Sequence, residues 1–99
     1  MLKIAKERLE DALTVRPEGR LDTVTAPELE QALREELADV KTLVLDMSGL
    51  EYISSAGLRV LLAAQKQMNR QGTMKLVGVS EDIMEIFEIT GFCDILTIE

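Results

Sequence analysis

Two adjacent serines, Ser54 and Ser55, stand in the stretch ISSAGLRVLL, just before a pattern typical of an amphipathic helix. A serine becomes an acyl-transfer nucleophile when a histidine takes its proton, and this chain contains no histidine. The GxSxG motif of a nucleophile elbow is also missing. A lysine could activate a serine instead, but Lys41 and Lys66 fall where a loop and an exposed helix face are expected. We therefore expect no catalytic residue and no enzyme.

The start of a helix gives these hydroxyls two other roles. One hydroxyl can accept a hydrogen bond from a backbone N–H of the first turn, a cap worth about 1 kcal/mol. An exposed hydroxyl can also be phosphorylated, because the helix dipole and the free N–H groups tolerate an added charge of about −1.5 to −2. Ala56 and Gly57 leave little bulk beside the serines, which favours a surface open to a partner protein. Gly57 costs about 1 kcal/mol of helix propensity relative to alanine and so indicates a steric requirement.

The composition narrows the classes of partner. The chain has a formal net charge of -7, with one tyrosine, two phenylalanines and no tryptophan. Nucleic-acid binders need a basic surface or aromatic side chains on which bases stack, so we expect no nucleic acid. No apolar run approaches the roughly 20 residues that cross a bilayer, and the sequence begins without a secretory leader. We expect a cytoplasmic protein without membrane insertion.

The single cysteine, Cys93, cannot form an intramolecular disulfide. The lack of histidine removes the imidazole that would activate this thiol and the commonest ligand of zinc sites. We expect a buried structural cysteine, no metal site and no cofactor.

The first residues predict a hairpin. Apolar residues alternate over 2–4 and 13–15, with a turn near Glu10 and Asp11. Pro17 cannot donate a ladder hydrogen bond. We therefore expect the second strand to end near Pro17, to lie at an edge, or to carry a bulge before Gly19.

The next segment, EGRLDTVTAPELEQALREEL, predicts the first helix. Thr25 and Glu28 have the spacing of a capping box, and Pro27 suits a first helical turn. Apolar residues at helical spacing predict its buried stripe, namely Ala26, Leu29, Leu33 and Leu37.

The run TLVLDM, residues 42–47, is continuously apolar up to its aspartate, which predicts a central strand covered on both faces. A polar break over 48–55 follows. Apolar residues at helical spacing then predict a second helix that closes at Gln71 and Gly72.

The last third of the chain predicts a strand over 73–79 and a third helix that Ser80 caps and Gly91 ends. A final strand is expected over Asp94–Ile98. The order is β-β-α-β-α-β-α-β, which indicates a single α/β domain with a mostly parallel sheet and an N-terminal antiparallel hairpin. In such sheets, functional sites gather at the carboxyl ends of strands, where the two serines fall.

The sequence features described above occur together in one protein family. The segment LVLDMSGLEYISSAGLRVLLAAQKQMNRQGTMKLVGVSEDIMEIFEITGF, preceded by GRLD at 19–22, resembles the STAS domain family, specifically the bacterial anti-sigma factor antagonists. The resemblance covers nearly the whole chain, so residues 1–99 are expected to form one STAS domain.

The resemblance implies a phosphorylation site. In the family, an aspartate ends the central strand, and a phosphorylatable serine is followed by a small residue, glycine and leucine. Aligned on Gly57 and Leu58, the acceptor falls on Ser55, the small residue on Ala56 and the aspartate on Asp46.

The resemblance also implies a partner surface. The family's G-x-L-D motif matches Gly19, Leu21 and Asp22, and its aspartate lies near the switch serine. The position before the acceptor is often aspartate in these antagonists, and here it is Ser54, which remains a rival acceptor. The expected partner-binding residues are Asp22, Ser54, Ser55, Ala56, Gly57 and Arg59.

The implied function is a binding module that captures an anti-sigma factor, itself a serine kinase, and so frees a sigma factor. Phosphorylation by that kinase would end the capture, and a separate phosphatase would restore it. The kinase brings ATP and magnesium, so this chain needs no cofactor, and we expect no small-molecule ligand. The alternative is a STAS accessory subunit that docks on a transporter ATPase without a phosphorylation cycle. A nucleotide-binding enzyme has little support, because no Gly-rich phosphate loop follows any strand.

Overall fold

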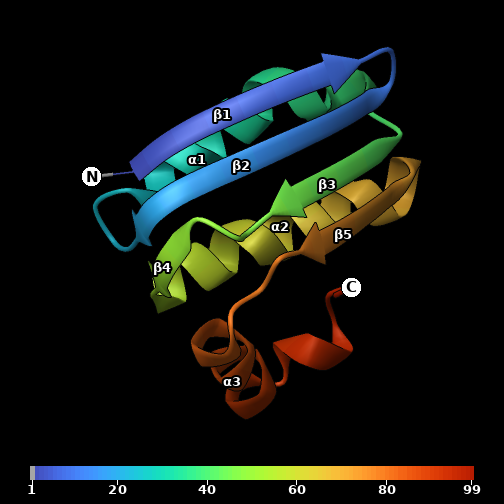
Figure 1. The fold of residues 1–99 in the computed structure, drawn as a ribbon. Coiled ribbons are helices and arrows are strands. Elements are labelled where there is room, and N and C mark those ends of the chain that lie inside the picture. Colours follow the sequence, from blue (N-terminus) through green and yellow to red (C-terminus); the bar gives the residue numbers. More distant parts are fainter. Residues whose placement is uncertain (1) are drawn as a thin grey trace.

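A computed structural model describes residues 2–99, and these residues form a sheet with helices (Figure 1). The elements in chain order are β1 (Leu2–Leu9), β2 (Ala12–Leu21), α1 (Ala26–Glu36), η1 (Leu37–Asp39), β3 (Thr42–Asp46), β4 (Leu50–Ile53), α2 (Ser55–Gln71), β5 (Thr73–Val77), α3 (Glu81–Thr90) and η2 (Phe92–Asp94). The strand order is β1-β2-β3-β5, with β4 also paired to β2. Among the strands of residues 2–99, only β1 and β2 pair in antiparallel fashion, which confirms the predicted hairpin and mostly parallel sheet.

The partner change along β2 explains how the strand contains a proline. Residues 12–15 of β2 pair with β3, and Gly19 begins the pairing with β4. Pro17 falls between these two ladders, where the missing N–H costs no inter-strand hydrogen bond. The register with β4 shifts between Gly19 and Arg20. The extra residue is Glu51 of β4, so the bulge expected in β2 before Gly19 is not the one observed, and β2 continues past Pro17 to Leu21.

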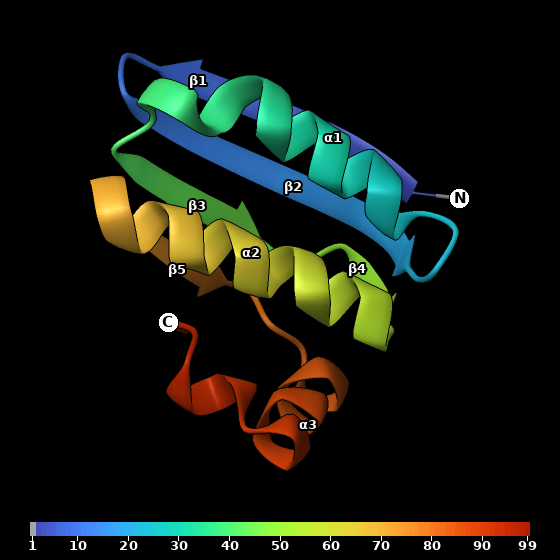
Figure 2. The same cartoon turned by 180° about the vertical axis from the view of Figure 1, so that it is seen from behind.

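Helices α1 and α2 cover the same face of the sheet (Figure 2). The burial of β3 alternates: Leu43 and Leu45 are buried, whereas Val44 and Asp46 are only half-buried. The expectation that this strand is covered on both faces is wrong, because Val44 and Asp46 point to the side without helices. Its central position, between β2 and β5, is confirmed.

Local signals mark both ends of α3, and a glycine follows the end of α2. The Ser80 hydroxyl accepts a hydrogen bond from the Ile83 N–H at 3.3 Å, as expected of a cap. Gly91 has φ 81°, the left-handed conformation that favours glycine at a helix C-terminus. Gly72 follows the last residue of α2, as predicted.

Two strand predictions need correction. The expected polar break contains β4, in which Leu50 and Ile53 are buried and the two residues between them are exposed. The final strand shrinks to an isolated parallel bridge between Leu76 and Ile98, because residues 92–94 form the 3-10 turn η2.

The core lies between the sheet and its helices and confirms the predicted stripe of α1. The largest side chains with almost no exposure include Phe87, Leu61 and Met47. Cys93 is only half-buried and packs against the edge of this core, so its expected full burial is wrong.

Candidate functional site

A backbone hydrogen bond brings two predicted site residues to the same end of the sheet. The Ser54 N–H donates to the carbonyl of Leu21, the last residue of β2, at 2.9 Å. Asp22 follows Leu21 directly, and Ser55 follows Ser54 as the first residue of α2. The bond therefore holds the Asp22 loop beside the start of the helix that carries Ser55.

The carboxylate of Asp22 organises the loop before α1. Its Oδ1 accepts hydrogen bonds from the N–H groups of Val24 and Thr25, both at 3.0 Å. The Thr25 hydroxyl donates to the Arg20 carbonyl at 2.7 Å and accepts from the Asp22 N–H at 2.8 Å. The predicted capping box is wrong, because Thr25 turns back to this loop and makes no side-chain cap. The spacing of Asp22 and Thr25 is typical of such a turn and could have revealed Thr25 in the sequence.

These contacts also keep Asp22 ionised. Hydrogen bonds from Thr25 and Val24, together with the nearby Arg20 guanidinium, hold the pKa of Asp22 below its ordinary value. Arg20 lies 4.2 Å from the centre of the Tyr52 ring and 4.0 Å from Asp22 Oδ2. The site thus presents a fixed negative charge beside a cation stacked on an aromatic ring.

The two serines differ in accessibility. The Oγ atom of Ser54 is buried and has no hydrogen-bond partner among residues 2–99. Ser55 is exposed on the first turn of α2. Ser54 occupies the N-cap position with an extended backbone, but its hydroxyl caps nothing. The interpretation that one of the two serine hydroxyls caps this helix is therefore wrong.

This difference predicts opposite results at two helix starts. Ser80→Ala should lower the free energy of unfolding by about 1 kcal/mol, because it removes a cap that is present. Ser54→Ala should change it by less than about 0.5 kcal/mol, because the hydroxyl makes no bond to lose. Urea denaturation of both variants measures the two changes. A loss near 1 kcal/mol in Ser54→Ala would show that Ser54 is a cap in solution.

Gly57 is buried, and its steric requirement lies inside the domain. A Cβ on Gly57 would lie 2.7 Å from Leu21 Cγ and 2.8 Å from Ile53 Cγ1. The glycine therefore lets α2 approach β2 and β4 closely. The interpretation that Gly57 leaves the surface open to a partner protein is therefore wrong.

The other predicted partner residues line a hollow between the starts of α1 and α2. The half-buried Ala56 and the exposed Arg59 contribute from α2. The hollow has a volume of about 220 Å³, and its remaining walls are Thr23, Ala26, Pro27, Glu30 and Val60. The sequence patterns had not indicated Thr23 as part of this site.

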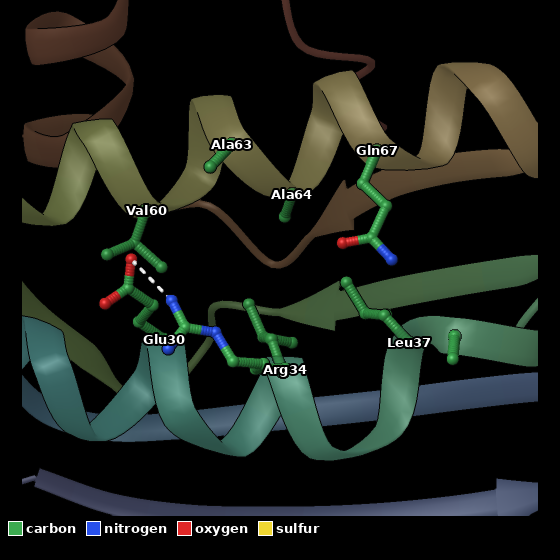
Figure 3. A pocket seen from close by; sticks show the side chains of 9 residues that line it. Glu30, Arg34, Leu37, Val60, Ala63, Ala64 and Gln67 are labelled. Atoms are coloured by element: carbon green, nitrogen blue, oxygen red, sulfur yellow. Dashed lines mark ion pairs between the residues drawn. The ribbon is translucent and has the colours of Figure 1, made fainter.

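The hollow continues into a groove along the same two helices, since Glu30 and Val60 line both (Figure 3). The groove has a volume of about 190 Å³. In Figure 3, Val60, Ala63 and Ala64 point from α2 toward α1. Glu30 and Arg34 form an ion pair of 3.6 Å at its rim. A partner that docks on Ser55 would therefore find a furrow with apolar walls and a charged rim.

Asp46 ends β3, as the alignment on Gly57 and Leu58 implied. Its Oδ1 accepts a hydrogen bond from the Ser48 hydroxyl at 2.7 Å, and its Oδ2 lies 3.0 Å from Arg16 Nε. The Ser48 bonds and the Arg16 guanidinium hold the pKa of Asp46 below its ordinary value. Asp46 thus anchors the loop that leads into β4.

Within residues 2–99, no group of three or more His, Cys, Asp or Glu side chains is arranged to hold a metal ion. None of the helices in this range is both long and apolar enough to span a membrane. The candidate site is formed by the Asp22 loop and by the starts of α1 and α2.

Comparison with known proteins decides the family, because the STAS domain model matches residues 3–99. The chain belongs to the STAS domain family. This STAS domain is 37% identical over 98 residues to the anti-sigma-B factor antagonist of Listeria monocytogenes, covering 95% of this chain and 84% of the relative.

Solved structures agree with this assignment. An anti-sigma factor antagonist from Mycobacterium paratuberculosis superposes with a TM-score of 0.90 at 27% identity, covering 99% of this chain and 85% of the other. The phosphorylated form of the Bacillus cell fate determinant SpoIIAA gives a TM-score of 0.76 at 16% identity, covering 98% and 91%. The second likeness shows the fold alone.

Proposed function

We propose that this STAS domain is an anti-sigma factor antagonist that is switched by phosphorylation of Ser55. Without phosphate it binds an anti-sigma factor and so frees a sigma factor. The anti-sigma factor is a serine kinase, and its transfer of phosphate to Ser55 ends the binding. A phosphatase that removes the phosphate restores it. These regulators act on transcription in the cytoplasm, where we also place this chain.

The single observation that carries the proposal is the exposed Ser55 hydroxyl at the start of α2, beside the ionised Asp22 loop. A kinase must reach the hydroxyl oxygen, and the buried Oγ of the rival Ser54 is out of reach. The names of the relatives support the same role. Accessibility therefore favours Ser55 over Ser54 as the acceptor.

The fold can carry the phosphate without unfolding. A phosphate on the first residue of a helix interacts favourably with the helix dipole and with backbone N–H groups that have no intrahelical partner. The partner would meet an added charge of about −1.5 to −2 at the start of α2, which the Ser54–Leu21 hydrogen bond holds beside the Asp22 loop. The charge therefore acts on the complex and leaves the domain intact.

The experiment begins with capture of partners on the purified chain from a lysate of the organism that encodes it. Proteins that bind are identified by mass spectrometry, and the captured kinase is then incubated with the chain, ATP and magnesium. We expect one phosphate per chain, located on Ser55 by peptide fragmentation. Ser55→Ala should accept none, and the matched control Ser54→Ala should accept as much as the wild type.

Three other results would overturn the proposal. Phosphate on Ser54 would move the switch by one residue. Binding of a protein that is neither a kinase nor an anti-sigma factor would remove the antagonist function. Capture of a transporter ATPase, with equal strength by the wild type and Ser55→Asp, would establish the alternative of a transport accessory subunit.

A further inference from the structure

One edge of the sheet is covered by other residues of the chain, and the other edge is open. At the β5 edge, Leu76 donates to the Thr97 carbonyl at 2.8 Å and accepts from the Glu99 N–H at 2.9 Å. The C-terminal residues thereby cover this edge. At the opposite edge, β1 pairs with β2 alone among the described strands, over its whole length from Leu2 to Leu9. One long strand therefore presents free backbone groups, a template for pairing with another strand.

The hairpin determines which backbone groups of β1 point outward. Leu9 and Ala12 flank a two-residue turn, and such residues exchange backbone hydrogen bonds. Bonding then alternates along the strand, so the odd-numbered residues of β1 bond to β2. The N–H and C=O groups of Leu2, Ile4, Lys6 and Arg8 point to the open edge.

Charged side chains usually protect an exposed edge from such pairing. Two of the four charged side chains of β1, however, already form ion pairs with carboxylates of α1 and η1 in the same chain. Lys6 Nζ lies 3.5 Å from a Glu36 carboxylate oxygen, and Arg8 lies 2.8 Å from Asp39. Lys3 and Glu7 remain, and within residues 2–99 neither makes an ion pair. Both are exposed on the face of the sheet without helices.

We propose that β1 pairs with β1 of a second copy of this chain, antiparallel about a twofold axis at Ala5. This register sets Ile4 opposite Lys6 and Lys3 opposite Glu7. Its hydrogen-bonded pairs use the outward residues identified above, and it spans residues 2–8. Lys3 and Glu7 fall at positions without hydrogen bonds, where the Cα atoms are only about 4.5 Å apart.

The charges select this register over its neighbours. The axis at Ala5 sets Lys3 of each copy against Glu7 of the other, so the interface contains two opposite-charge pairs. A shift of the axis to Lys6 would oppose Lys6 to itself and Ala5 to Glu7, with no attraction. A shift to Ile4 would leave Lys3 opposite Ala5. Cross-strand pairs of opposite charge stabilise a sheet, and like charges destabilise it.

The site at Ser55 stays free in this dimer. β1 lies on one side of β2, whereas β4 and the start of α2 lie on the other (Figure 1). Two copies joined through β1 would form one continuous sheet with both Ser55 sites away from the axis. The proposal is therefore independent of the function of Ser55.

The test measures association by sedimentation equilibrium from micromolar to millimolar protein, at about 0.15 M salt to screen the net charge of -7 on each copy. The wild type should show a monomer–dimer equilibrium. Lys3→Glu and Glu7→Lys should each weaken it about tenfold, because each creates two like-charge pairs. The double variant Lys3→Glu/Glu7→Lys should return to within about twofold of the wild type. Lys66→Glu, an equal charge change on the exposed face of α2, should have no such effect.

Amide exchange gives a second measurement. Protection of the Ile4, Lys6 and Arg8 N–H groups should rise with protein concentration, because the partner strand accepts their hydrogen bonds. A wild type that stays monomeric at millimolar concentration overturns the proposal. So does a dimer in which these amides stay unprotected, or one that the double variant fails to restore.

Discussion

Ser55→Asp is expected to weaken binding of the anti-sigma factor by about 100-fold and to leave the domain fully folded. The carboxylate adds a negative charge beside Asp22, whose pKa the loop already holds low. Loss of about 3 kcal/mol by repulsion and desolvation at the interface corresponds to that factor. Isothermal titration calorimetry with the purified partner measures it.

The stability of the same variant separates a switch from a structural serine. A carboxylate on the first turn of α2 interacts favourably with the helix dipole, worth about 0.5 kcal/mol. The free energy of unfolding should therefore stay equal or rise slightly. Ser55→Ala, the neutral control, should bind the partner within about twofold of the wild type. Equal affinity of Ser55→Asp and Ser55→Ala for the partner would show that charge at this position does not control binding.

Elements that end at local signals could be predicted from the sequence. Ser80 and Gly91 mark the ends of α3, and each acts through its own backbone or a neighbour three residues away. The apolar stripe of α1 is likewise a property of one helix. These features need no knowledge of what lies opposite them, so the order of the elements could be predicted.

Features that depend on distant contacts could not be predicted. β4 has only four residues, and the buried Leu50 and Ile53 look like isolated apolar residues in a polar loop. The uncovered face of β3 follows from the placement of α1 and α2 on one side, which no single strand encodes. Pro17 is tolerated because β2 changes partner at that point.

The candidate site divides in the same way. The family pattern places Ser55 and Asp22 in the sequence, and the Ser54–Leu21 hydrogen bond explains how they meet. The burial of the Ser54 hydroxyl depends on the surrounding fold, so two adjacent serines look equivalent in the sequence. Gly57 shows the same limit: the sequence indicates a steric requirement and cannot say from which side it comes.

Gly57→Ala is expected to lower the free energy of unfolding by about 1 kcal/mol net. Helix propensity alone would raise it by about 1 kcal/mol. The new Cβ, however, would lie 2.7 Å from Leu21 Cγ and 2.8 Å from Ile53 Cγ1, both in buried side chains that have little room to move. Overpacking of this kind costs about 1–3 kcal/mol and outweighs the gain. Urea denaturation with an unchanged m-value measures the difference.

Two comparisons identify the cause of this loss. Ala56→Gly, one position earlier in α2, should also destabilise, by about 1–2 kcal/mol, because it lowers helix propensity and removes a half-buried methyl group that packs against the core. Gly57→Ala should cost less in a Leu21→Ala background, since two of its three close contacts involve Leu21. An equal loss of unfolding free energy in the wild-type and Leu21→Ala backgrounds would show that contacts with other residues than Leu21 cause the strain. Because Leu21 precedes Asp22 and bonds to Ser54, the overpacked variant should also displace the Asp22 loop from Ser55. Its partner affinity should then fall with its stability, whereas Ser55→Asp loses affinity alone.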